Sequence, residues 1–321
     1  MEQLNNIQIS IQAPETSRKS FIEANTMGAS LDEIKTSHIV PVFAKDCEPV
    51  ISHCDFIEMT HEVVSGFYNG EVISKPAIRL SHPIQGRVAS ARFKPLQNCD
   101  DNEKTIYYDR MIFAIEIPGI SDDIDGNSLS LTIGGVKAYS LDNLQSRKGA
   151  DEHFKLFIGF KNTVCTNLCV WTDGIMDDIK VSNLGHLKAC VNTLLENYNA
   201  VYQISTMRKL VDYSLTEQQF AQLIGRCRMY NNLPVKQKLE IPQMLFGDQQ
   251  MNVVVKDFYK DDSFCKDAEG NINLWKLYNL FTNANKSTYI DNFLQKEINA
   301  LHFVENVKDA LDNKTTNWFL N

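Results

Sequence analysis

The first half of the chain alternates between apolar and polar residues, the pattern expected of strands with one buried face. Alternation is clearest over residues 105–117 and 128–139, and Asp125, Gly126 and Asn127 between them are typical of a hairpin turn. Shorter β-prone stretches cover residues 77–81, 88–93, 154–160 and 164–171. The connections are too short for helical crossovers, which predicts about six antiparallel strands, with 77–81 and 88–93 paired as one hairpin.

From residue 185 onward, apolar residues recur at intervals of three and four, which is typical of amphipathic helices. A single helix of about seven turns is predicted over residues 187–210. Thr216 and Gln219 form a capping-box pattern that begins the next helix. Asn273 and Ser287 are candidate caps for two later helices. The other predicted helices cover residues 55–67, 251–259, 274–281, 288–299 and the residues before 313.

Strands followed by helices predict an α+β fold: an antiparallel β meander of about six strands followed by a helical C-terminal half. We divide the chain into an N-terminal arm over residues 1–46, an α+β domain containing the sheet over 47–184, and a helical domain or subdomain over 185–321. An alternating stretch at residues 7–11 is a candidate edge strand in the arm. In the helical half, the core is expected to bury the side chains of Trp275, Leu277, Tyr278 and Phe281.

The composition agrees with this organisation, because 321 residues that are 43% hydrophobic and 22% charged can bury a sizeable core. No run of about 18 apolar residues is present, and the N-terminus lacks the basic and apolar regions of a secretory signal. We therefore expect a cytoplasmic protein that does not enter a membrane and keeps its eight cysteines reduced.

Candidate chemistry begins with Cys165, Cys169, His186 and Cys190, whose spacing superficially resembles a zinc site. Cys165 and Cys169 are predicted on one strand and thus about 13 Å apart, which is too far for two ligands of one ion. We interpret them as small core residues and expect no metal and no cofactor. No phosphate-binding loop, dinucleotide fingerprint or nucleophile elbow occurs in the sequence, so a non-catalytic protein is favoured over an enzyme.

The distribution of charge supplies the remaining candidate site. The net charge is −8, yet no acidic residue lies between Glu71 and Asp100. The candidate anion-binding residues in and after this stretch are Lys75, Arg79, His82, Arg87, Arg92, Lys94, Tyr107 and Tyr108. On a hairpin, the basic side chains would form a stripe that suits phosphates, and the tyrosines would stack on bases.

An alternative interpretation of the same residues is structural. Acidic clusters at residues 100–103, 122–123, 177–178 and 261–262 are predicted to lie in loops. The arginines would then pair with neighbouring acidic loops, and the aromatic rings would fill the core. Both interpretations remain open from the sequence.

Several stretches together resemble one protein family. They are residues 21–26 (FIEANT), 39–43 (IVPVF), 81–87 (SHPIQGR), 154–171 (FKLFIGFKNTVCTNLCVW), 220–230 (FAQLIGRCRMY) and 274–294. Nearly end to end, the chain resembles the family called domain of unknown function 3871, found in gut Bacteroidetes and linked to mobile genetic elements. Residues 164–167 (VCTN) are distantly similar to a broader family of phage- and plasmid-type proteins. The resemblance implies a mobile-element context and brings no catalytic residues.

Two hypotheses of function are compatible with these observations. In the first, a non-catalytic mobile-element protein binds single-stranded nucleic acid weakly through the basic hairpin over residues 75–94. In the second, the chain is a protein-interaction module that modulates a host or phage enzyme through an acidic surface. The first hypothesis alone predicts binding to DNA that weakens steeply with salt.

Overall fold

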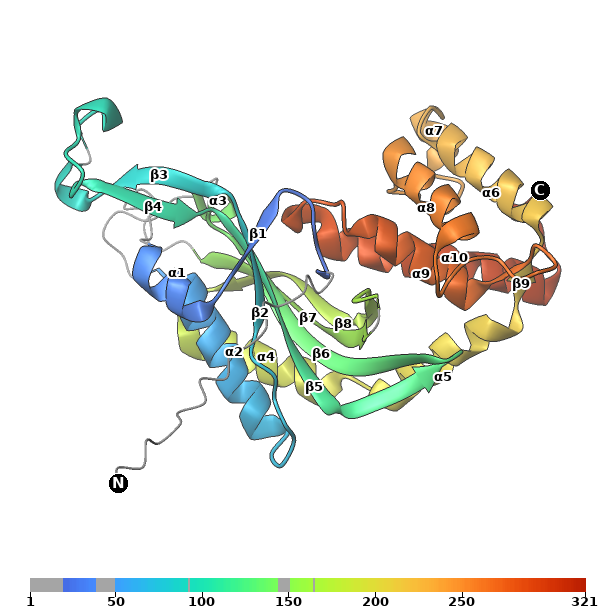
Figure 1. The fold of residues 1–321 in the computed structure, drawn as a ribbon, viewed down its shortest axis with the longest axis horizontal. Coiled ribbons are helices and arrows are strands. Elements are labelled where there is room, and N and C mark those ends of the chain that lie inside the picture. Colours follow the sequence, from blue (N-terminus) through green and yellow to red (C-terminus); the bar gives the residue numbers. More distant parts are fainter. Residues whose placement is uncertain (1–19, 39–49, 92, 144–150, 164) are drawn as a thin grey trace, which may run out of the picture.

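A twisted six-stranded antiparallel sheet forms the centre of the protein (Figure 1). The computed structural model describes residues 20–38, 50–91, 93–143, 151–163 and 165–321. In the order β1-β2-β5-β6-β7-β8, every neighbouring pair is antiparallel. These strands are β1 Thr26–Ala29, β2 Ala77–Ser81, β5 Arg110–Ile124, β6 Asn127–Ala138, β7 Glu152–Asn162 and β8 Leu168–Val181. The predicted antiparallel sheet followed by a helical half is confirmed.

Strands β5 and β6 form a long hairpin around the turn that the sequence predicts. Asp125 and Gly126 both have positive φ, 52° and 74°, as a two-residue hairpin turn requires. The predicted turn is therefore confirmed. Asp122 and Asp123 lie on β5 rather than in a loop, because the ladder with β6 runs up to the turn itself.

The predicted pairing of residues 77–81 with 88–93 is wrong, because β2 pairs with β1 on one side and with β5 on the other. After one further residue the chain enters β3 (Pro83–Arg87), which pairs with β4 (Lys104–Tyr108). These two strands form a separate sheet that projects from the rest of the molecule (Figure 1). Two short 3₁₀ turns, Ala89–Ala91 and Leu96–Asn98, follow β3. We call residues 83–108 the projecting hairpin.

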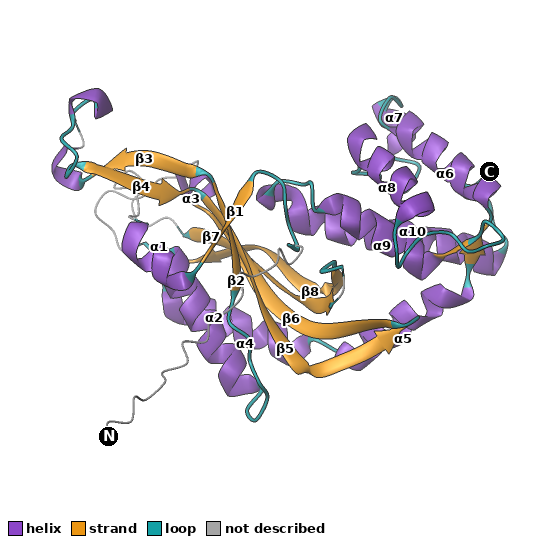
Figure 2. Cartoon of the chain, in the orientation of Figure 1, coloured by secondary structure: helices purple, strands orange, loops and turns teal. Residues whose placement is uncertain are grey.

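Helices cover both faces of the central sheet (Figure 2). Along β5, Phe113 contacts Phe56 of α2, while its neighbours Ile112 and Ala114 face the start of α10. Helix α4 lies beside α2 and packs on β7 and β8. The helices are α1 Leu31–Ser37, α2 His53–Phe67, α3 Tyr139–Asn143, α4 Leu184–Asn197, α5 Ala200–Lys209, α6 Glu217–Tyr230, α7 Val235–Lys238, α8 Asp248–Lys260, α9 Leu274–Asn285 and α10 Ile290–Asn313.

The first described residues, 20–24, are held by the turn between α9 and α10. The backbone N–H groups of Glu23 and Ala24 both donate to the carbonyl oxygen of Lys286. The Phe21 ring meets the Phe293 ring edge to face, with 6.4 Å between centroids. Since β1 follows directly, the edge of the sheet is joined to the last two helices of the chain.

The helix predicted over residues 187–210 is two helices, α4 and α5. Tyr198 is extended, and the side chain of Asn199 accepts a hydrogen bond from the backbone N of Tyr202. Asn199 is therefore an N-cap that begins a new helix.

The helices predicted over 288–299 and before 313 are a single helix, α10. Its N-cap is Tyr289 rather than the predicted Ser287. The capping box of Thr216 and Gln219 begins α6, and Asn273 caps α9, so these two predictions are confirmed.

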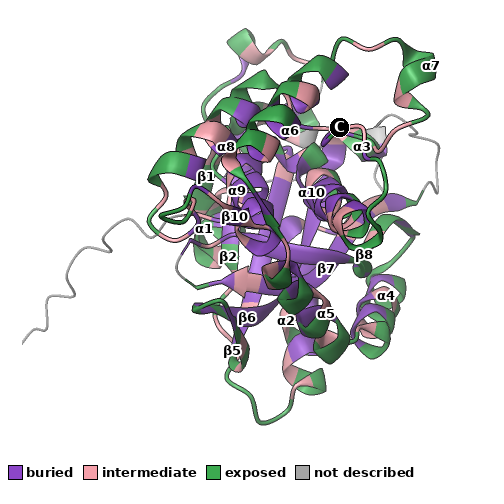
Figure 3. Cartoon of the chain, turned by 90° about the vertical axis from the view of Figure 1, so that its right-hand side faces the viewer, coloured by how far each residue is buried: buried purple, intermediate pink, exposed green. Residues whose placement is uncertain are grey.

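One cluster of buried apolar side chains joins the sheet to the C-terminal helices. Figure 3 shows buried positions through the middle of the molecule and exposed ones on the outer helices. The predicted core residues Trp275, Leu277, Tyr278 and Phe281 are fully buried. The division of the chain at residues 46 and 184 stays a prediction, and residues 7–11 lie outside the described residues. None of the described helices is both long and apolar enough to cross a lipid bilayer.

Candidate functional site

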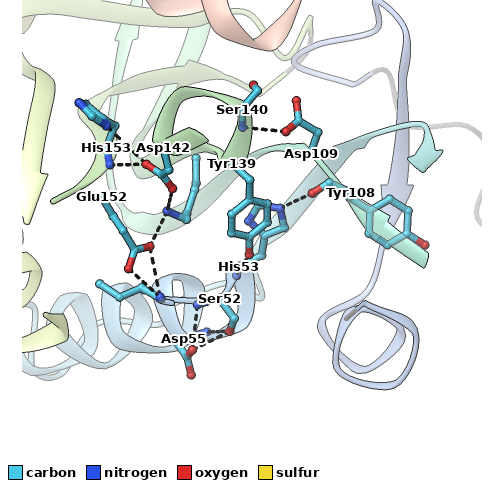
Figure 4. Close-up of polar contacts among 12 residues, drawn as sticks. Ser52, His53, Asp55, Tyr108, Asp109, Tyr139, Ser140, Asp142, Glu152 and His153 are labelled. Atoms are coloured by element: carbon cyan, nitrogen blue, oxygen red, sulfur yellow. Dashed lines mark hydrogen bonds and ion pairs between the residues drawn. The ribbon is translucent and has the colours of Figure 1, made fainter. Parts of the chain in front are cut away.

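Three charged side chains are buried together where β6 passes into α3 (Figure 4). Lys137 Nζ lies 2.9 Å from Asp142 Oδ2 and 2.8 Å from Glu152 Oε2, and the three side chains are at most 1% exposed. The ammonium also lies 4.0 Å from the centre of the Phe154 ring. Burying an ion costs several kcal/mol unless it is paired. Each member of this network therefore depends on the others.

The network positions two neighbouring segments. The backbone N of Ile51 lies 3.1 and 3.2 Å from the two carboxylate oxygens of Glu152, which anchors the chain just before α2. Asp142 Oδ1 accepts a hydrogen bond from the backbone N of His153 at 2.8 Å. The same oxygen lies 3.4 Å from Nδ1 of the His153 ring. On the other side of the ring, Nε2 lies 3.9 Å from Asp178 Oδ1. The imidazole is thus held between one buried and one exposed carboxylate.

His153 lines a cavity of about 300 Å³ between β6, β7, β8 and the start of α10. A second cavity, of about 280 Å³, lies between β1, β2, β5 and the same helix end. Asp291, in the first turn of α10, lines both cavities. Its Oδ2 accepts a hydrogen bond from Arg110 Nε at 2.5 Å, and Arg110 also lies 3.2 Å from Asp109. This ion pair therefore stands between two neighbouring cavities.

Four rings stack behind this end of the sheet. The centroid of His53 lies 4.8 Å from that of His38 and 4.5 Å from that of Tyr139, and Tyr108 stacks on His38. His53 Nε2 lies 2.8 Å from the carbonyl oxygen of Tyr108 (Figure 4). Burial lowers the pKa of His38 to about 4 and the pKa of His53 well below its usual range. Both imidazoles are therefore neutral near pH 7. Tyr108, which the sequence predicts to stack on bases, is half-buried and stacks on His38.

Among the described residues, the fold does not gather the predicted basic side chains into one stripe. Lys75 precedes β2 and is separated from the projecting hairpin by the whole of that strand. Arg79 is bound within the sheet, because its guanidinium donates to the hydroxyl and carbonyl oxygens of Thr26 at 2.9–3.1 Å. His82 is exposed between β2 and β3, and Arg92 lies outside the described residues.

The remaining basic side chains are bonded within the projecting hairpin. Arg87 donates to the carbonyl oxygen of Lys94. Lys94 Nζ lies 2.6 Å from Glu103 Oε2 and 3.6 Å from Asp100 Oδ2. A further pair joins Lys104 to Asp101 at 2.9 Å. Acidic residues of the same hairpin thus partner the two lysines. The described arginines of the predicted set, Arg79 and Arg87, instead bond to Thr26 and to a backbone carbonyl, not to the acidic loops that the alternative interpretation expects.

Apolar side chains are exposed on both faces of the projecting hairpin. Ile84 is 41% exposed, Ile106 is 42% exposed, and Phe93 beyond β3 is 86% exposed. Ile84 pairs with Tyr107, whereas Ile106 pairs with Gln85, so the two isoleucines point to opposite faces. The sequence predicts that Tyr107 stacks on bases. In the structure the Tyr107 ring lies over Gly86, where an added Cβ would be 3.5 Å from the ring.

Three of the described thiols are poor nucleophiles. Burial raises the pKa of Cys54 to about 11 and also raises the pKa values of Cys165 and Cys169, which disfavours the nucleophilic thiolate. Cys165 lies in the turn before β8 rather than on a strand, and Cys169 lies on β8. Within the described ranges, no three His, Cys, Asp or Glu residues are grouped so that they could hold a metal ion.

Comparison with protein families identifies the chain. A family model described as "Domain of unknown function, B. Theta Gene description (DUF3871)" matches residues 2–320. The chain belongs to this family. The resemblance seen in the sequence of this DUF3871 protein is therefore confirmed. No curated protein matches the chain, and no solved structure matches it.

The sequence did not predict several residues at the centre of the site in this DUF3871 protein. One signal was available: Lys137 interrupts an apolar strand, and a lysine in a buried strand needs an acidic partner. Arg110 and Asp291 are too far apart in sequence for any pattern to join them. The acidic pair Asp177 and Asp178 lies on β8 rather than in the predicted loop.

Proposed function

We propose that this DUF3871 protein is a non-catalytic protein-interaction module whose projecting hairpin contacts the partner. The observation that supports this proposal is a contrast within the hairpin itself. Its described basic side chains are bonded to groups of the hairpin, whereas Ile84, Phe93 and Ile106 expose apolar surface. Aromatic side chains such as Phe93 are enriched at the buried centre of protein–protein interfaces.

The charge of the molecule also favours a protein over a polyanion. Phosphates would have to compete with Glu103 for Lys94 and with Asp101 for Lys104, in a chain of net charge −8. A protein partner needs no such exchange, because it would remove the apolar side chains from water. Phe93 has the size and exposure of an anchor that fills a pocket on the partner.

The mobile-element context implied by the family resemblance belongs to the same proposal. The partner would be a host or phage enzyme, and the module would modulate that enzyme. In this arrangement the hairpin supplies the contact while the sheet and helices hold it in place.

Photo-crosslinking at Phe93 tests the proposal. Phe93 is replaced with p-benzoylphenylalanine in cells that produce the full chain, and the adducts formed on irradiation are treated with protease or with nuclease. Leu239, 82% exposed and outside the hairpin, is the matched control position. Adducts at position 93 that nuclease leaves intact, and whose crosslinked partner is digested by protease, would support the proposal. No adduct, or the same adducts at 239, would contradict it.

A second candidate function, binding of single-stranded nucleic acid, is supported by the position of Phe93 beside Lys94. An exposed aromatic ring next to a cation is the combination used to stack a base and hold its phosphate. Adducts at 93 that disappear with nuclease would favour this function over the first.

A further inference from the structure

The proposed function does not involve the cavity that His153 lines. Its volume is about 300 Å³, and its apolar wall includes Val136, Ala138 and Leu141. Three carboxylates line it, from Asp177, Asp178 and Asp291. Ligand cavities span about 300–1,000 Å³, so this one suits a single side chain or a small molecule.

A break in the β7–β8 ladder brings two consecutive aspartates to the same cavity. The pairing of β8 with β7 shifts in register between Phe154 and Leu156 of β7. In the shifted part of β8, Asp178 has a φ of +56°. In a regular strand, neighbouring side chains point to opposite faces. A bulge re-aims one of them, and here Asp177 and Asp178 both line the cavity.

Each carboxylate of the cavity wall has a cationic neighbour, but one carboxylate oxygen has no hydrogen-bond partner among the described residues. Lys155 is the one lysine or arginine in the described lining, and its Nζ lies 2.8 Å from Asp177 Oδ1. Asp291 is paired with Arg110 through Oδ2, but its Oδ1 is buried and has no hydrogen-bond partner among the described residues. Asp178 is 66% exposed at the rim, 3.0 Å from Lys180. The buried Oδ1 of Asp291 is therefore an acceptor that a hydrogen-bond donor in the cavity would satisfy, and a cationic donor forms the stronger bond to a carboxylate.

We infer that this cavity binds an organic cation, a guanidinium or ammonium group on an aliphatic stem. The stem would lie against the apolar wall, and the charged group would lie between Asp178 and Asp291. The same chemistry is offered by a free amine and by an arginine or lysine side chain of another protein. The inference uses no residue of the projecting hairpin, so it can fail or succeed independently of the proposed function.

Calorimetric titration of the full chain tests the inference with two probes of the same shape. Butylguanidinium carries the charge, and butylurea is its neutral analogue. We expect butylguanidinium to bind about tenfold more tightly than butylurea and to weaken as salt rises. Equal binding of the two probes, or no binding of butylguanidinium at about 10 mM, would overturn the inference.

Two matched variants locate the binding. Asp178→Asn removes the charge and keeps a residue that tolerates positive φ, and it should weaken butylguanidinium binding about three- to tenfold. Asp248→Asn is the control, because Asp248 is 60% exposed and paired with Arg228 in the helical half. An equal effect of the two variants would overturn the inference.

A third titration distinguishes the two sources of the cation. The probe is the peptide N-acetyl-Gly-Arg-Gly-amide. Tighter binding of this peptide than of butylguanidinium would assign the cavity to a basic side chain of a partner protein, and weaker binding would assign it to a free amine. Either result supports a cation site, provided that Asp178→Asn weakens the binding.

Discussion

Two lysines of this protein are each held by two carboxylates, and they differ in their access to water. Lys137 lies 2.9 and 2.8 Å from Asp142 and Glu152 and is fully buried. Lys94 lies 2.6 Å from Glu103 and 3.6 Å from Asp100 and is 39% exposed. Short distances are thus common to both sites, but water and salt screen only the second. The buried network holds the fold, whereas the exposed one sets the charge on the surface of the projecting hairpin.

The largest expected effect comes from removing the buried cation. Lys137→Ala leaves two carboxylates buried without their cation and should lower the free energy of unfolding by about 3–5 kcal/mol. Denaturant unfolding of the purified chain measures this. Adding Asp142→Asn and Glu152→Gln to the variant should recover part of the loss. A loss below about 1 kcal/mol would show that the network does not hold the end of the sheet.

Acid should destabilise the same end of the sheet through His38. The folded pKa of about 4 lies below the ordinary value of 6.5, so the unfolded chain binds the proton first. Stability is fully present above pH 6.5 and is lost as the pH falls towards 4, by roughly 2–3 kcal/mol. Thermal melts across this range measure the loss. His38→Phe keeps a ring in the stack and should flatten the dependence, and an unchanged profile would contradict the assignment.

Binding of nucleic acid to the projecting hairpin should be absent, because the basic groups described in it, Arg87, Lys94 and Lys104, are already bonded within the hairpin. Fluorescence anisotropy with a labelled single-stranded DNA at about 50 mM salt measures this. Detectable binding would favour the second candidate function. In that case, replacing Arg87 and Lys94 with Gln should flatten the log–log salt slope by about 0.7 for each lost phosphate contact.

The smallest effect is expected at the exposed lysine. Lys94→Ala should leave the thermal midpoint unchanged within error at any salt concentration, because an exposed ion pair contributes little to stability. A midpoint shift as large as that of Lys137→Ala would remove the distinction between the two sites.

Local patterns in the sequence were sufficient for the central elements of the fold. Alternation over 128–139 and the turn at Asp125 and Gly126 predict the β5–β6 hairpin, because a hairpin is specified by residues close in sequence. The partner of β2 was predicted wrongly, since its pairing with β1 and β5 depends on residues far from it in the chain. The break before α5 depends on a single cap at Asn199 inside an unbroken apolar period.

The candidate site was less accessible from the sequence, for a related reason. The basic side chains were found, but their acidic partners decide their role, and pairs such as Lys94 with Glu103 form only once β3 and β4 are aligned. The cavity needs contacts across the whole chain, as between Arg110 and Asp291. A bulge that turns Asp178 beside Asp177 has no composition signature.

The attachment of residues 20–24 to the turn between α9 and α10 has a consequence for synthesis on the ribosome. The hydrogen bonds of Glu23 and Ala24 need the carbonyl of Lys286, about 260 residues later in the chain. At a synthesis rate of about 5–20 residues per second, Glu23 and Ala24 are made roughly 10–50 s before Lys286. During that interval Phe21 lacks the Phe293 ring against which it packs, which makes residues 20–24 the natural place for a chaperone to bind the nascent chain.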